Sequence, residues 1–162
     1  MNKYDNVEKR MSGNNQSEEN FIAYLEKRQY NYHQIGFQKQ PTQDEWKRLP
    51  YIMRYTPDFV VWQNNVPKFY EVKSAKHGTF LFKHNNHINY LKWRENSGMP
   101  VIYTICHYSS IYNYQYAFIL VDATKMTKIA EKYDPEYVKD VWGKLIPVSE
   151  LIKDENNIGY IK

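Results

Sequence analysis

Two short runs of aromatic and β-branched residues stand on either side of a polar pair near the middle of the chain. The first run is Phe59-Val60-Val61-Trp62, and the second covers residues 68–72, Lys-Phe-Tyr-Glu-Val. Such residues suit a pleated strand. Asn64-Asn65 between the runs tolerates the positive φ angles of a two-residue turn. The pattern predicts a β-hairpin in which the numbers of paired residues sum to 129.

The rest of the chain alternates between helical and extended patterns. Ser17 is suited to cap a helix, and the apolar stripe of Phe21, Ile22 and Leu25 behind it predicts a helix over 17–28. The further elements that we expect are a strand over 32–38, a loop with a helical turn over 39–50, a helix over 83–96, strands over 101–106 and 116–121, and helical segments over 123–132 and 135–142. This order predicts an α/β fold whose mixed sheet carries helices on its faces.

The length and composition of the chain limit its domain number, its compartment and its association with membranes. With 162 residues, 42% of them hydrophobic, we expect residues 17–162 to form a single domain after a mobile segment, residues 1–16. Cys106 is the single cysteine, which excludes an intramolecular disulfide and favours a reducing compartment such as the cytoplasm. No apolar run is long enough to span a bilayer, so no membrane association is expected.

The predicted hairpin brings charged residues together. Its pairing rule sets Asp58 opposite Glu71, and Lys73 shares the face of Glu71 because side chains alternate along a strand. Directly opposed carboxylates repel each other, whereas a bound divalent cation relieves the repulsion. Mg²⁺ prefers carboxylate oxygens and water, and it can activate water and polarise a phosphoryl oxygen. Lys73 can stabilise developing negative charge or orient the attacking water. These residues predict a site that hydrolyses phosphodiesters.

Pro57-Asp58 followed by Glu71-Val72-Lys73 resembles the signature of the PD-(D/E)xK nuclease superfamily. The resemblance covers about residues 17–122 and implies a restriction endonuclease-like fold, a mixed sheet flanked by helices. It implies Mg²⁺, with Mn²⁺ as a substitute, held by Asp58, Glu71 and the carbonyl of Val72, and it implies a DNA substrate, duplex or branched. The alternative is a solvated hairpin with unrelated surface charges.

The predicted first helix also resembles the first helix of many superfamily members, where a glutamate on the core side helps to hold the metal. That role falls to Glu18, which lies at the edge of the apolar stripe, with Glu19 as the second choice. The alternative is that both acids only favour the positive end of the helix dipole.

Basic residues supply the remaining candidates. Residues 51–100 carry seven Lys or Arg and three Asp or Glu, an excess that suits a phosphate backbone. The resemblance points to Lys83 first and His87 second as supporting contacts on the predicted helix. Further candidates for nucleic-acid contact are Arg54, Lys76, Lys92 and Arg94. The alternative for all six of these residues is that they are ordinary exposed side chains that bind no ligand. A structural zinc site is disfavoured because the chain has no paired cysteines.

Together these features predict a metal-dependent deoxyribonuclease from a phage or a mobile element, acting in the cytoplasm of a bacterial or phage-infected cell. Two alternatives remain: a Holliday-junction resolvase that works as a homodimer, and a catalytically silent nucleic-acid-binding or interaction module with the same fold.

Overall fold

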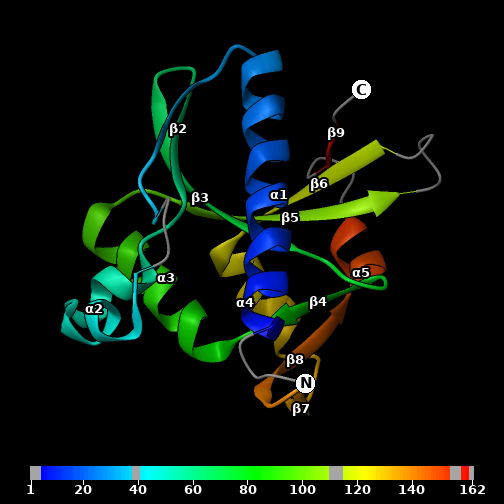
Figure 1. The fold of residues 1–162 in the computed structure, drawn as a ribbon. Coiled ribbons are helices and arrows are strands. Elements are labelled where there is room, and N and C mark those ends of the chain that lie inside the picture. Colours follow the sequence, from blue (N-terminus) through cyan, green and yellow to red (C-terminus); the bar gives the residue numbers. More distant parts are fainter. Residues whose placement is uncertain (1–4, 38–40, 110–114, 154–157, 161–162) are drawn as a thin grey trace.

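The computed structural model describes residues 5–37, 41–109, 115–153 and 158–160 and is drawn in Figure 1. Its helices are α1 (Asp5–Lys27), α2 (Gln43–Arg48), the 3₁₀ helix η1 (Tyr51–Tyr55), α3 (His84–Ser97), α4 (Ala123–Ala130) and α5 (Val148–Ile152). Its strands are β1 (Asn31–Gln34), β2 (Phe59–Gln63), β3 (Val66–Ser74), β4 (Thr79–Phe82), β5 (Val101–Ser109), β6 (Gln115–Asp122), β7 (Glu136–Val138), β8 (Val141–Pro147) and β9 (Ile158–Tyr160).

The predicted central hairpin is confirmed in its register. Strands β2 and β3 are antiparallel, and Phe59 lies opposite Tyr70 while Gln63 lies opposite Val66, so paired numbers sum to 129. Asn64 and Asn65 have φ angles of 50° and 62°, as a tight turn with two left-handed residues requires. The register therefore carries Asp58 to the position opposite Glu71.

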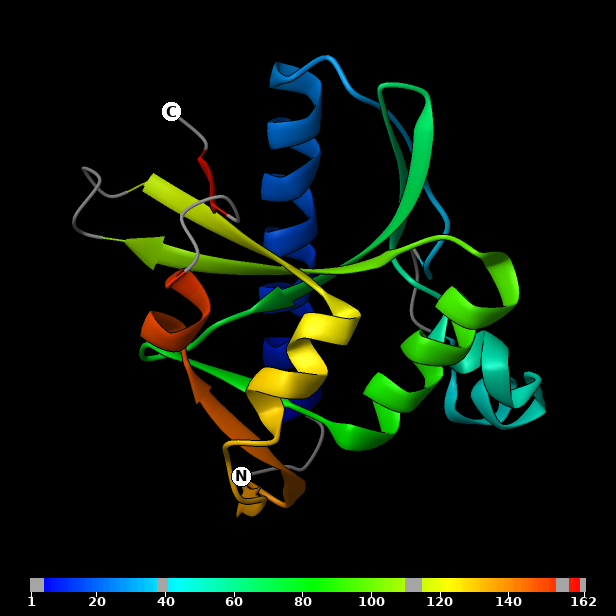
Figure 2. The same ribbon diagram turned by 180° about the vertical axis from the view of Figure 1, so that it is seen from behind.

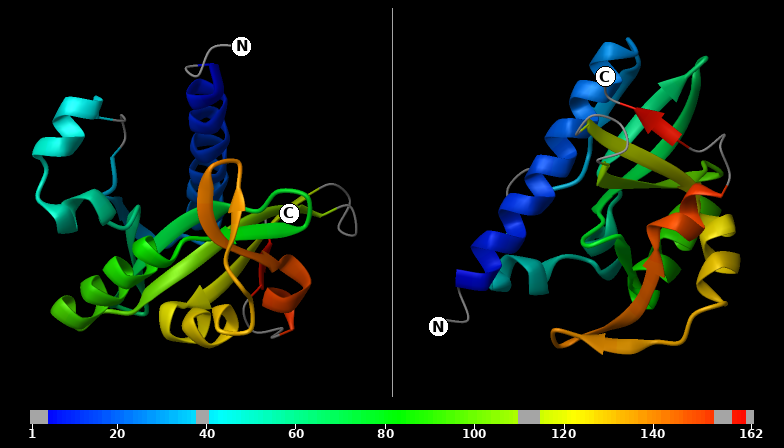
Figure 3. Two further views of the ribbon diagram at one scale, coloured as in Figure 1. Left: turned by 90° about the horizontal axis from the view of Figure 1, so that it is seen from below. Right: turned by 90° about the vertical axis from the view of Figure 1, so that its right-hand side faces the viewer.

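The main sheet has six strands in the order β1-β2-β3-β5-β6-β9, and β3–β5 is its parallel pair. A second, antiparallel sheet has the order β4-β8-β7. Helix α1 crosses one face of the main sheet, and α3, α4 and α5 lie on the other, as Figure 2 and the right panel of Figure 3 show. The predicted α/β fold, a mixed sheet flanked by helices, is confirmed.

Each face of the main sheet has its own apolar core. On the α1 side, Phe21 and Leu25 of the helix pack with Phe59, Tyr70 and Val72 of the hairpin. On the opposite side, alternate residues of β3 and β5 pack with α3, α4 and the second sheet; members of that cluster include Phe69, Tyr103, Tyr90, Met126 and Phe82. Glu71 and Lys73 alternate with the α1-facing residues, so they point toward the α3 side.

The structure corrects several predicted elements, and the strand expected over 32–38 ends at Gln34. Helix α1 begins at Asp5 rather than at Ser17. Residues 135–142 form the β7–β8 hairpin rather than a helix, with Val138 paired to Val141. Lys139 and Asp140 adopt φ angles of 47° and 66°, which close a two-residue turn, and the flanking aromatic and β-branched residues favour strands.

None of the helices in the described ranges is long and apolar enough to cross a membrane.

Candidate active site

The charged residues of the hairpin meet where β2 ends and β3 continues. Asp58 precedes β2 by one residue, and its Oδ2 accepts a hydrogen bond of 2.7 Å from the backbone N–H of Val72. Beyond this point, among the described residues, β3 continues to pair with β5 on its other side, with Lys73 opposite Ile105. The Asp58 side chain thus continues the pairing after the β2–β3 ladder has stopped. This bond fixes one carboxylate oxygen and leaves Oδ1 directed elsewhere.

Glu71 is the buried carboxylate of the site, with 3% of its surface exposed. Its Oε1 accepts hydrogen bonds from the ammonium of Lys73 and from the hydroxyl of Tyr90 on α3. Its Oε2 is buried and has no hydrogen-bond partner among the residues that the structure describes. A buried carboxylate oxygen without a donor is costly, because its water is lost and not replaced.

Glu18 reaches the site from α1. The hydroxyls of Ser17 and Ser74 lie 2.6 Å apart and join the helix to the end of β3. Glu18 accepts a hydrogen bond of 3.0 Å at Oε2 from Gln34 of β1. Burial raises the pKa of Glu18, the charge of Lys73 lowers it, and the charge of Glu71 raises it. Glu18 is therefore within electrostatic reach of the hairpin charges, whereas Glu19 is exposed. The arrangement favours Glu18 over Glu19.

The electrostatics of Asp58 and Lys73 reflect three carboxylates around one ammonium. Burial raises the pKa of Asp58 well above its ordinary value, and the charge of Glu71 raises it further. Burial works to lower the pKa of Lys73, but the charges of Glu71, Asp58 and Glu18 outweigh this, so its pKa is raised. Lys73 stays charged at neutral pH. Its single positive charge does not balance three neighbouring carboxylates, so a bound cation would stabilise their ionised forms.

The donor set suits a hard divalent cation. Mg²⁺ is commonly held by one or two carboxylates together with water and substrate phosphate. Asp58 and Glu71 provide two neighbouring carboxylates, and the unpartnered Oε2 of Glu71 is an oxygen that a cation would satisfy. Within the described ranges, no group of three or more His, Cys, Asp or Glu side chains is placed so that it could hold a metal ion, so Glu18 does not form a three-carboxylate group with Asp58 and Glu71. The residues fit a cation that shares its coordination with water and phosphate, and they do not fit a closed structural site.

Gly36 sets how closely β1 approaches Asp58. The backbone N–H groups of Ile35 and Gly36 donate to the Asp58 carbonyl at 2.8 and 3.1 Å. A Cβ atom at position 36 would lie 3.0 Å from the Asp58 Cα and 3.1 Å from its Oδ1. Both distances are tighter than ordinary van der Waals contact, so a side chain at this position would require Asp58 or the segment after β1 to shift by a few tenths of an ångström.

His87 is buried rather than on the surface, and its contacts give no support to the predicted phosphate contact. It is 2% exposed, and its Nδ1 lies 2.9 Å from the Tyr103 hydroxyl while its Nε2 lies 2.8 Å from the Thr127 hydroxyl. Burial, with a smaller contribution from His84, lowers the pKa of His87 to about 4. Both ring nitrogens are engaged, so the neutral imidazole joins α3 to β5 and α4.

Arg54 also has a structural role that the prediction did not include. Its guanidinium donates to the carbonyls of Leu49 at 3.2 Å and Lys47 at 2.8 Å, which joins the C-terminal end of α2 to η1. These bonds give no support to the predicted phosphate contact. The other basic candidates, Lys76, Lys83, Lys92 and Arg94, are exposed, and their contact with nucleic acid stays a prediction.

Tyr90 and Gln34 are site residues that the sequence did not reveal. Tyr90 follows His87 by three residues on the inner side of α3, a position that by itself predicts only core packing. Its hydroxyl is placed on Glu71 by the way α3 crosses the sheet. Gln34 contacts Glu18 through the pairing of β1 with β2, which no local pattern indicates.

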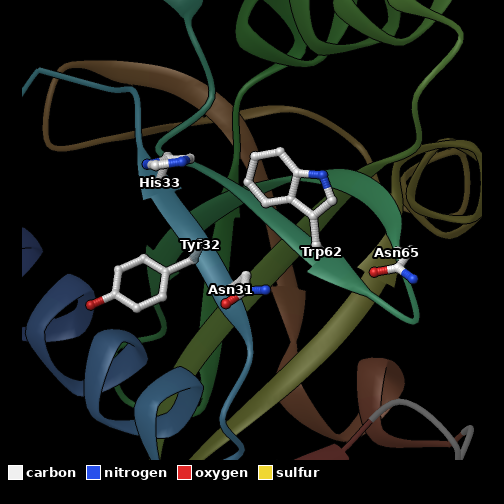
Figure 4. Close-up of a pocket in the computed structure, with 5 residues that line it drawn as sticks. All are labelled: Asn31, Tyr32, His33, Trp62 and Asn65. Carbon is white, nitrogen blue, oxygen red and sulfur yellow. The ribbon is translucent and has the colours of Figure 1, made fainter.

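A separate pocket of about 360 Å³ lies at the β1 edge of the sheet, lined by Asn31, Tyr32, His33, Trp62 and Asn65 (Figure 4). It contains none of the catalytic candidates.

Comparisons with known proteins bear on the fold. No protein-family model matches the chain, and no curated protein matches it. Among solved structures, the chain is similar to a Holliday junction resolvase, Hjc, of the archaeal hyperthermophile Archaeoglobus fulgidus. The two share 11% sequence identity with a TM-score of 0.51, over 85% of this chain and 90% of the other. The chain has the restriction endonuclease-like fold.

Proposed function

We propose that the chain is a divalent-metal-dependent nuclease that hydrolyses DNA phosphodiester bonds at Asp58, Glu71 and Lys73. One observation carries the proposal. Two carboxylates from the end of one hairpin converge beside an ammonium, and the buried Oε2 of Glu71 has no donor among the described residues. Buried carboxylate oxygens in folded proteins ordinarily have a donor, and a bound cation would take that place here.

In this proposal Asp58, Glu71 and the Val72 carbonyl hold Mg²⁺, or Mn²⁺ in its place, and Glu18 supports them from α1. The ion would supply charge neutralisation at the phosphate and would make water more acidic. Tyr90 orients Glu71 through its hydroxyl, and Val72 N–H orients Asp58. Lys73, whose side chain is 30% exposed, is placed to stabilise negative charge on the phosphate or to orient the attacking water.

A more specific candidate is a resolvase that cleaves branched DNA as a homodimer. It is favoured by the likeness to a Holliday junction resolvase over most of both chains. The candidate from another class is a silent binding module, and the three intact site residues disfavour it.

A cleavage panel tests the proposal and separates these candidates. Single-stranded, duplex and four-way-junction DNA, together with duplex RNA, are incubated with the protein in Mg²⁺, Mn²⁺ or EDTA. The proposal expects cleavage of a DNA form in either ion and none in EDTA. Preference for the junction, together with a dimer by light scattering, supports the resolvase. Binding without cleavage in any ion supports the silent module and refutes the proposal.

A further inference from the structure

The pocket at the β1 edge combines two aromatic rings with two side-chain amides. His33 and Trp62 form its aromatic part, with ring centroids 5.4 Å apart and an angle of 87° between the ring planes. Asn31 and Asn65 supply the amides. In Figure 4 the rings of His33 and Trp62 project to one side of the sheet edge, and the ring of Tyr32 points away toward the helix.

The rings of this pocket are accessible. His33, Asn31 and Asn65 are exposed, and Trp62 is half-buried. Two rings at a right angle form a corner, in which a flat heterocycle can stack on one ring while its edge meets the other. An amide carries two donors and an acceptor, which match the hydrogen-bonding edge of a nucleobase. The lining residues thus offer both stacking and polar recognition to one planar polar ring.

The pocket lies on the same side of the sheet as the candidate active site. Trp62 pairs with Pro67, and Pro67 alternates with Phe69, Glu71 and Lys73 along β3. Trp62 is four residues from Asp58, which corresponds to about 13 Å along a strand. A stacked nucleic-acid strand advances about 3.4 Å per nucleotide, so the separation corresponds to about four nucleotides or fewer if the strand is extended.

The edge strand connects the two places. Ile35, two residues beyond His33, is 38% exposed, and its N–H donates to the Asp58 carbonyl at 2.8 Å. Strand β1 is an edge of the six-stranded sheet, so no other strand in the described part of the chain covers its outer side. A DNA strand cleaved at Asp58 and Glu71 can therefore run along β1 to the pocket.

We propose that the pocket of His33, Trp62, Asn31 and Asn65 binds one unpaired base of the DNA, within about four nucleotides of the cleaved bond. This inference rests on the proposed function. It makes the protein a nuclease that recognises an unpaired base beside its cleavage position. Aromatic stacking supplies the affinity, because every base has a π-face. The hydrogen bonds of the two amides restrict which bases fit, because each base has a different pattern of donors and acceptors along its edge.

The test uses a DNA duplex with one unpaired 2-aminopurine and the same duplex fully paired. Affinities for the full-length protein are measured in Ca²⁺, which suits oxygen ligands and limits cleavage during the titration. We expect roughly tenfold tighter binding of the bulged duplex, the usual size of one stacking contact, and quenching of the 2-aminopurine fluorescence. In His33→Ala and Trp62→Ala the preference should fall to about twofold or less.

Trp142→Ala is the matched control, because Trp142 is 53% exposed on β8 and outside the pocket. It should keep the full preference. His33→Ala alters an exposed side chain, so the test does not depend on the folding of the Trp62 variant.

Equal affinity of the parent protein for both duplexes would overturn the proposal, as would an unchanged preference in both pocket variants. A change of oligomeric state in Trp62→Ala without DNA, with no effect on base preference, would instead assign the pocket to contact between copies. If the protein cleaves DNA but binds both duplexes equally, the proposed base-binding role of the pocket is wrong and the proposed nuclease function stands. Base preference without cleavage in any divalent ion overturns the proposed function and leaves the pocket standing.

Discussion

Replacing Gly36 by alanine perturbs the active site through one methyl group. The new Cβ would lie 3.0 Å from the Asp58 Cα and 3.1 Å from its Oδ1, where ordinary contact begins at 3.4 Å. Asp58 or β1 must therefore move by about 0.3 to 0.4 Å, the shortfall against normal van der Waals separation. A misplacement of 1 Å in an active site costs about 100-fold in rate, so a shift of this size should cost roughly fivefold.

The assay compares single-turnover cleavage at saturating enzyme with unfolding in urea. Gly36→Ala should lower the Mn²⁺ affinity and slow cleavage roughly fivefold, and overpacking should cost up to about 1–3 kcal/mol of stability. Gly143→Ala is the matched control, because its Cβ would meet the Phe82 carbonyl at 2.7 Å, away from the site residues. The control should lose more stability yet keep the parental rate wherever it is folded.

A Gly36→Ala variant that loses stability but cleaves at the parental rate with unchanged Mn²⁺ affinity would show that Gly36 does not set the position of Asp58. That result would mean that the added methyl group displaces β1 while Asp58 keeps its position. The position of Asp58 would then not depend on how the edge strand packs against it.

Three further substitutions have distinct expected outcomes. Lys73→Ala should spare or slightly raise metal affinity, because a neighbouring cation is lost, while single-turnover cleavage falls about 100-fold or more; a lost affinity with a normal saturated rate would make Lys73 a backbone contact instead. Tyr90→Phe should lower the free energy of unfolding by about 1.5–3 kcal/mol in urea, because a donor to the buried Glu71 is lost, whereas Tyr137→Phe, 75% exposed, should change nothing. His87 is held neutral with its pKa lowered to about 4 from 6.5, so the stability it contributes is present above pH 6.5 and is lost as pH falls toward 4; denaturation between these limits should show a weaker loss in His87→Gln, and an equal loss would contradict the assignment.

The hairpin and its charged residues could be predicted from sequence because their determinants are local. Asn64-Asn65 fixes the turn, the turn fixes the register, and the register brings Asp58 to Glu71. The turn at Lys139-Asp140 is harder to predict, because Asp140 favours turns but Lys139 does not, and the sequence therefore predicts a helix over 135–142 in place of the β7–β8 hairpin.

The surroundings of the site could not be predicted because they depend on how distant elements pack. His87 and Tyr90 are neighbours on one side of α3, and the sequence gives no reason to choose between them. The crossing of α3 over β5 places Tyr90 on Glu71 and His87 on Tyr103. Gly36 likewise has no signal in the sequence beyond its being a glycine within the predicted strand over 32–38, and its role appears only when Asp58 lies against it.

The most direct test of the central claim is single-turnover cleavage of the preferred DNA form as the divalent ion is removed and restored. Parent protein should cleave in Mg²⁺, stop in EDTA and resume when Mn²⁺ is added, and Glu71→Gln, with its buried charge removed, should not cleave in either ion. Full activity of the parent protein in EDTA, or a parental rate in Glu71→Gln, would contradict the account.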